Sequence, residues 1–178
     1  MKSLFVASCL VIGLSLSTPL PALAQNPAAD KQQIEAIVET FRMAIINKDP
    51  DSFMKLFLHE DITWSGVMSD GSLERINASI KDPAEPRPKK YFNSKPRKFI
   101  EGIAKRPARL EETFDTIRID SDGDVAQVWF DYTFVEDGHK NNWGKESWQM
   151  VRTATGWKIA AVIWSMEDNP VPAPAQKK

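Results

Sequence analysis

The sequence predicts a single α+β domain in which helices from the first half of the chain cover one face of a curled antiparallel sheet. Three observations carry this prediction. Apolar residues between positions 28 and 47 recur at the spacing of a helix face. From Leu110 onward, four runs of strand-forming residues follow one another, separated by turn residues. The last run, from Trp157 to Met166, is rich in β-branched and aromatic residues and follows a turn at Gly156.

The helical part begins with two capping signals. A residue that favours the N-cap is followed by proline at positions 26–27 and again at 49–50, and proline is favoured at the first helical position. These signals place a long helix at about residues 28–47 and a short one after the second proline. A third helix is expected at residues 73–80, and Ser94 is expected to cap a fourth.

The strands are predicted from alternation of apolar and polar residues. A first strand is expected at residues 62–67, before a proline-rich loop at 81–97 whose length is typical of lids and binding loops. The other four strands are expected to form an antiparallel meander, at residues 110–120, 125–136, 143–153 and 157–166. Strands of this length that bend tend to wrap around a core or a ligand.

The first 24 residues have the layout of a secretory signal peptide. Lys2 provides a short positive region, an apolar run extends from Leu4 to Leu16, and Ala22-Leu23-Ala24 is typical of a cleavage site. The apolar run is too short for the roughly 20 residues of a spanning helix, so no stable membrane insertion is expected. We therefore predict cleavage after Ala24 and a periplasmic or secreted protein.

The expected mature chain is one domain, at residues 25–167, followed by a proline-rich tail at 168–178 that is predicted to be disordered. The one cysteine, Cys9, lies in the signal peptide, so neither a disulfide nor a thiolate ligand is expected. The net charge of −1 gives no argument for nucleic acid binding. His59 and His139 have no convergent partners in the sequence, so neither a metal site nor a cofactor is predicted.

The charges are unevenly distributed along the chain. Residues 87–109 carry nine basic side chains against one acidic one, and residues 111–137 have the opposite bias. A solvated basic loop and helix beside acidic turns explains this pattern. The alternative is a basic rim that attracts anions to a pocket or contacts a membrane surface.

Two stretches resemble a known family. The sequence Phe-Leu-His-Glu-Asp-Ile-Thr-Trp at residues 57–64 and the ending Gly-Trp-Lys-Ile at 156–159, followed by Trp164-Ser165, resemble the nuclear transport factor 2-like superfamily. Within it, residues 124–126 and 143–144 are similar to a small exported branch that is named for lumazine binding. The resemblance covers roughly residues 28–166.

The resemblance implies a cone, also called cystatin-like, with a bent sheet around the long helix and a pocket open at one end. Proteins with this cone include isomerases and dehydratases as well as proteins that catalyse nothing, so the fold does not decide the function. Many relatives have histidines at the positions of Ala161 and Ile163. Because both are apolar here, inherited acid–base catalysis is in doubt.

Strand alternation, together with the resemblance, predicts which side chains face into the cone. The inward residues expected to bind a ligand are Trp64, Phe130, Tyr132, Glu146, Trp148, Met150 and Ile163. An aromatic pocket with few polar groups suits a small aromatic or hydrophobic ligand. The alternative is that these aromatic residues simply fill the core.

Two other functions remain open. Glu146 as a base and Tyr132 as a hydrogen-bond donor would suit an isomerase or dehydratase, against the simpler interpretation of a rim carboxylate and a core tyrosine. Alternatively, an outer sheet face would form a homodimer, since large apolar side chains on an outer face usually mark an interface. This face is expected to comprise Gln127, Trp129, Asp131 and Trp164.

Overall fold

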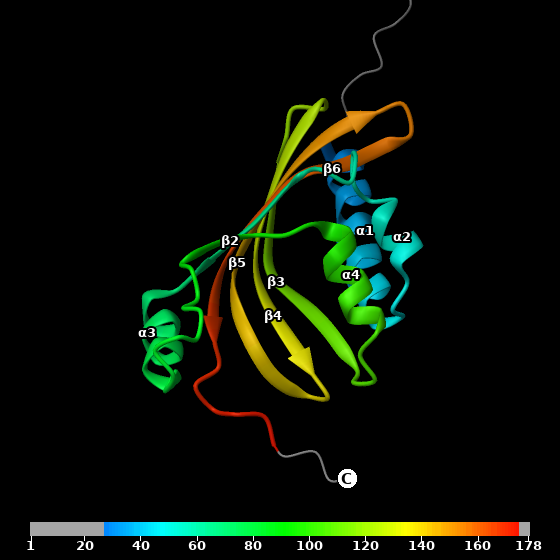
Figure 1. Ribbon diagram of the computed structural model, residues 1–178. Coiled ribbons are helices and arrows are strands. Elements are labelled where there is room, and N and C mark those ends of the chain that lie inside the picture. Colours follow the sequence, from blue (N-terminus) through cyan, green and yellow to red (C-terminus); the bar gives the residue numbers. More distant parts are fainter. Residues whose placement is uncertain (1–26, 175–178) are drawn as a thin grey trace, which may run out of the picture.

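A computed structural model describes residues 27–174 of the chain (Figure 1). The expected signal peptide and the last four residues of the expected tail lie outside this range. The elements are α1 (Pro27–Ile46), α2 (Pro50–Met54), β1 (Thr63–Met68), α3 (Asp70–Ser79), β2 (Tyr91–Asn93), α4 (Pro96–Ala104), β3 (Leu110–Ser121), β4 (Val125–Glu136), β5 (His139–Thr153) and β6 (Gly156–Asp168). Among these helices, none is both long and apolar enough to cross a membrane.

The six strands form one sheet in the order β2-β1-β6-β5-β4-β3. Strands β3 to β6 pair as the predicted antiparallel meander. Strand β1 joins β6 in parallel, with Thr63 opposite Ala161, so the sheet is mixed and β6 lies in its interior. The predicted α+β fold with a curled sheet is confirmed, and the expectation of purely antiparallel pairing is wrong at this one pair of strands.

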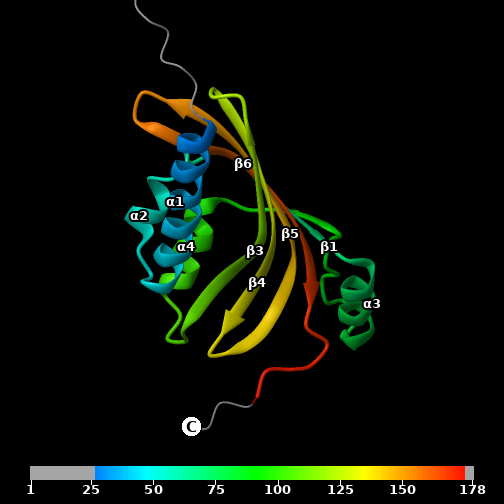
Figure 2. The same cartoon turned by 180° about the vertical axis from the view of Figure 1, so that it is seen from behind.

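The curl of the sheet follows from irregularities in its long strands. The β3–β4 register shifts between Asp115 and Arg118, where Thr116 has a positive φ of 54°, and further shifts lie in the β4–β5 and β5–β6 pairs. Bulges of this kind bend a strand and increase its twist. Helices α1, α2 and α4 lie on one side of the curled sheet, whereas α3 stands on the other side, beside the end of β6 (Figures 1 and 2).

Helix α1 supplies the centre of the core. Its residues Ile34, Val38, Phe41 and Ile45 are buried, as their helical spacing predicts. The Phe41 ring lies 4.7 Å from that of Phe53 on α2 and 5.0 Å from that of Trp148 on β5, measured between centroids. These aromatic contacts fix the distance between the helices and the sheet.

Three local predictions are corrected by the structure. Strand β2 lies inside the segment 81–97, which was expected to be entirely loop. The N-cap of α4 is Lys95 rather than Ser94, and it makes no side-chain capping bond. Strand β5 begins at His139 because Asp137 and Gly138, with φ of 48° and 82°, complete the turn by themselves. Two consecutive residues with positive φ are typical of a tight type I′ hairpin.

Candidate ligand-binding pocket

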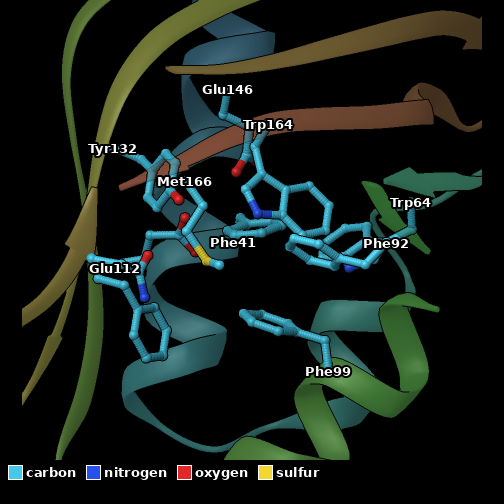
Figure 3. A pocket seen from close by; sticks show the side chains of 11 residues that line it. Phe41, Trp64, Phe92, Phe99, Glu112, Tyr132, Glu146, Trp164 and Met166 are labelled. Carbon is cyan, nitrogen blue, oxygen red and sulfur yellow. The ribbon is translucent and has the colours of Figure 1, made fainter. Parts of the chain in front are cut away.

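A cavity of about 200 Å³ lies between the curled sheet and the helices (Figure 3). Its walls come from α1, α4 and all six strands. The lining residues are Phe41, Trp64, Phe92, Phe99, Glu112, Tyr132, Phe134, Asn142, Glu146, Trp164 and Met166. Most are aromatic, two are acidic, and none is basic. The cavity therefore has an apolar wall and a small polar one.

The apolar wall is a set of rings in mutual contact. The Trp64 centroid lies 5.5 Å from the rings of both Trp164 and Phe99, and Phe92 lies 5.6 Å from Trp164. Gly66 on β1 makes this arrangement possible. A Cβ atom at Gly66 would lie 2.2 Å from the Phe92 ring and 2.8 Å from the Trp164 ring. The absence of a side chain there lets both rings lie over the strand.

The polar wall comes from three neighbouring strands. Tyr132 on β4 lies between Glu112 on β3 and Glu146 on β5. Glu112 pairs with Phe134 and Glu146 pairs with Phe130, and these are the inward residues of β4 on either side of Tyr132. The Tyr132 hydroxyl donates a hydrogen bond to the Ser165 carbonyl oxygen at 3.0 Å. The Trp148 Nε1 donates to Glu146 Oε1 at 2.5 Å. These contacts hold Tyr132 and Glu146 in place.

Glu112 has no such support. Within residues 27–174, the structure shows neither a hydrogen bond nor an ion pair to its carboxyl group, although the residue is only 4% exposed. Glu146 is 5% exposed. A carboxylate removed from water without a cationic partner is costly, and it tends to hold its proton instead. The pocket therefore contains two buried carboxyl groups that no side chain of residues 27–174 neutralises.

Burial changes the titration of all three polar groups. Loss of hydration raises the pKa of Glu146 from 4.5 to about 7, and the Trp148 hydrogen bond opposes this rise. Burial, together with the negative charge of Glu146, raises the pKa of Glu112 well above its ordinary value. Burial and the charges of both glutamates also raise the pKa of Tyr132. The two carboxyl groups therefore titrate as a pair, and burial favours their protonated forms.

These pKa values predict an unusual loss of stability with rising pH. Above pH 4.5, the folded protein keeps a proton on Glu146 that the unfolded chain releases. The contribution of Glu146 to the free energy of unfolding is therefore fully present below about pH 4.5 and is lost as the pH rises through about 7. The rise in pKa corresponds to about 3 kcal/mol. We expect urea unfolding of Glu146→Gln to depend less on pH than that of the wild type between about pH 5 and pH 8. Equal slopes in the two proteins would contradict this prediction.

The structure separates the predicted ligand-binding residues into three groups. Trp64, Tyr132 and Glu146 line the cavity. Phe130, Trp148 and Met150 point inward but are fully buried in the core behind the cavity wall. Ile163 was expected to face inward, and this orientation is wrong because its side chain is 51% exposed.

A bulge in β6 explains the error at Ile163. Met150 pairs with Ile159 and Gln149 pairs with Ala161, so Ala160 has no partner on β5. The extra residue reverses the alternation for the rest of the strand. Val162, Trp164 and Met166 consequently take the inner face. Trp164, which was expected on the outer face, instead lines the cavity.

Several lining residues were missed by the sequence analysis. Glu112 is the most important, and its position between Leu110 and Phe114 on the same face of β3 is a usable signal. Phe134 belongs to the inward-facing set on β4 but was not identified as a ligand contact. Phe92 and Phe99 come from the proline-rich segment and from α4, and no periodicity in the sequence connects them with the sheet.

More than half of the basic side chains at residues 87–109 form ion pairs outside the pocket. Five of these side chains form ion pairs, namely Lys90 with Asp70, Lys95 with Asp61, Arg97 with Glu60 and Glu101, Arg106 with Glu136, and Arg109 with Glu111. Among the residues that the structure describes, no basic side chain lines the cavity. This arrangement supports the solvated loop and helix rather than a rim that draws anions into the pocket.

No protein-family model and no curated protein matches the sequence. Solved structures do match it. A candidate scytalone dehydratase from Novosphingobium aromaticivorans is 17% identical, covers 85% of this chain and 96% of its own, and has a TM-score of 0.57. A candidate dehydratase of the NTF2-like family from Streptomyces avermitilis is 15% identical, with coverage of 79% and 97% and a TM-score of 0.55. An NTF2-like protein of unknown function from Shewanella baltica is 13% identical, with coverage of 81% and 98% and a TM-score of 0.55. At these identities the likeness concerns the fold, and the chain has the nuclear transport factor 2-like, cystatin-like fold that its sequence predicted.

Proposed function

We propose that the protein binds a small molecule with a flat, apolar body and one polar group in the pocket. The observation that carries this proposal is the composition of the cavity, which combines aromatic rings in mutual contact with two buried carboxyl groups. Ligand sites are commonly apolar cavities with a few placed polar groups. A volume of about 200 Å³ is below the roughly 300–1,000 Å³ typical of such sites, which favours a ligand of one or two rings.

A thermal-shift screen of flat aromatic compounds and steroids tests this proposal. We expect one- and two-ring compounds to raise the melting temperature, and larger steroids to do so less. Trp164→Ala should weaken this stabilisation because it removes part of the wall. Trp143→Ala is the matched control, since this tryptophan is partly exposed and does not line the cavity. Stabilisation by no compound in the screen would count against the proposal.

A second candidate function is proton transfer, as in an isomerase or dehydratase. The supporting observation is that Glu146, with a pKa of about 7, can hold or release a proton near neutral pH beside Tyr132. The solved structures named as candidate dehydratases have this fold, which adds only an analogy. The test is exchange of C–H protons for deuterium in bound carbonyl compounds, followed by NMR. Catalysis requires that Glu146→Gln abolish this exchange.

The homodimer is also a proposal, now with a revised face. Trp129 and Ile163, 38% and 51% exposed, lie on either side of Ser147 in one row across β4, β5 and β6. Exposed apolar side chains in one row are suited to a contact between two sheets. We expect residues 25–178 to sediment as a dimer at tens of micromolar, on the order of the concentrations at which weak contacts form. We also expect Ile163→Lys to yield a monomer. A monomeric wild-type protein would rule this interface out.

Export remains a proposal that rests on the sequence of residues 1–24. We expect the full chain, expressed in a bacterium, to reach the periplasm with Gln25 as its first residue. Mass spectrometry of the purified protein measures this directly. A protein that retains Met1 in the cytoplasm would contradict the proposal.

A further inference from the structure

The charge inside the pocket is unbalanced. Glu112 and Glu146 both face the cavity, and no lysine, arginine or histidine is among the residues that line it. Trp148 satisfies one oxygen of Glu146, and Glu112 has no partner among the described residues. A buried carboxylate requires a cation or several hydrogen-bond donors to be stable. The part of the chain that the structure describes supplies neither at Glu112.

The aromatic wall has a matching property. Trp164 is the cross-strand neighbour of Glu146, and Trp64, Phe92 and Phe99 continue the aromatic lining of the cavity (Figure 3). Aromatic faces attract organic cations, and tryptophan does so most strongly. Aromatic rings and carboxylates without a cationic partner in one site are complementary to the same kind of ligand.

We propose that the polar group of the ligand is a protonated amine, which lies between Glu112 and Glu146 while its apolar body contacts Trp64 and Trp164. This inference rests on the proposed ligand-binding function and narrows it to one class, the small aromatic or alicyclic amines. A carboxylate of the same shape would meet two acidic groups and no base. Such anions should therefore be excluded.

The inference predicts a distinctive pH dependence. An ammonium ion binds an ionised carboxylate. Below about pH 7 its binding must displace the proton of Glu146, so the affinity should fall. Two other titratable groups act on the pair of carboxyl groups. The hydroxyl of Tyr132 interacts with both glutamates, and the charge of Asp168 at the end of β6 acts on Tyr132. The other elements contribute uncharged side chains to the cavity. A neutral ligand that accepts a hydrogen bond from a protonated carboxyl group should instead bind more tightly as the pH falls.

A matched series of ligands tests the inference. Isothermal titration of tryptamine, tryptophol and indoleacetate compares an ammonium, a hydroxyl and a carboxylate on one ring system, and phenethylamine with phenethyl alcohol repeats the comparison on a smaller ring. Near pH 8 we expect each amine to bind at least about tenfold more tightly than its alcohol. We expect no binding of indoleacetate, and an amine affinity that decreases toward pH 6 with proton release.

Variants identify the groups responsible. Glu112→Gln and Glu146→Gln keep the shape of the side chain, and each should remove most of the preference for the amine while the alcohol still binds. Circular dichroism and the melting temperature check that both variants are folded. Alcohols that bind as tightly as amines, or amine affinity that is unchanged in both variants, would overturn the inference and leave the proposed function standing. If neither this series nor the broader screen shows binding, the proposed function itself fails.

Discussion

Replacement of Gly144 by alanine should lower the free energy of unfolding by about 3 kcal/mol or more. Gly144 lies on β5, where a Cβ atom would be 2.0 Å from the carbonyl oxygen of Ser165 and 2.7 Å from its carbonyl carbon. These atoms belong to the main chain of β6, so they cannot move aside as the end of a flexible side chain would. The neighbouring strand must shift as a whole, and the same Ser165 oxygen accepts the hydrogen bond from Tyr132.

The control for this prediction is Gly102→Ala. Gly102 is an exposed residue inside α4, and a Cβ atom there meets nothing within 4 Å. Alanine should therefore stabilise the helix by up to about 1 kcal/mol. Urea unfolding of the two variants and the wild type gives both values. If Gly144→Ala were as stable as the wild type, the close approach of β5 and β6 would be wrong.

Truncation of Trp148 to alanine should cost about 3–5 kcal/mol. This is the largest of the fully buried side chains, and its ring lies 5.0 Å from Phe41 and 5.2 Å from Phe130. The substitution leaves a void at the centre of the core and removes the donor that satisfies Glu146. Thermal or urea unfolding measures the loss, and a loss below about 1 kcal/mol would contradict the packing described.

Trp148→Phe separates the two effects. Phenylalanine keeps most of the ring contacts but has no N–H group, so the stability loss should be smaller than for alanine. The pKa of Glu146 should rise above about 7 because the hydrogen bond that lowers it is gone. Titration of the glutamate carboxyl carbons by NMR measures this change. An unchanged pKa would mean that the indole does not support the carboxylate.

Much of the fold could be predicted because the local sequence patterns agree with the packing of the folded protein. The alternation of β4 gave its bounds, 125–136, and the spacing of apolar residues on α1 gave its buried face. The turn at Asp137 and Gly138 was less visible, because polar residues at 139–142 continue as strand rather than loop. Strand β2 was not predictable from three residues in a proline-rich segment, since only its pairing with β1 makes it a strand.

The candidate site was predictable only where a strand is regular. Alternation correctly placed Tyr132 and Glu146 in the cavity wall. It failed for Ile163 and Trp164 because the bulge at Ala160 depends on how two strands pair, and no local pattern reveals it. Glu112 was overlooked because a buried, unpaired carboxyl group contradicts the usual expectation for glutamate. This contradiction is itself the feature that gives the pocket its chemical character.

The parallel pairing of β1 with β6 also bears on how the pocket is assembled. Strands β3 to β6 are consecutive, so their hairpins can close over short loops, whereas Thr63 reaches Ala161 only across most of the domain. Contacts between distant segments close late because they restrict the most chain entropy. Trp64 and Phe92 are carried by β1 and β2, so we expect them to complete the aromatic wall last. An amine that binds only the completed wall would stabilise this final step, so ligand binding and closure of the sheet edge should be thermodynamically coupled.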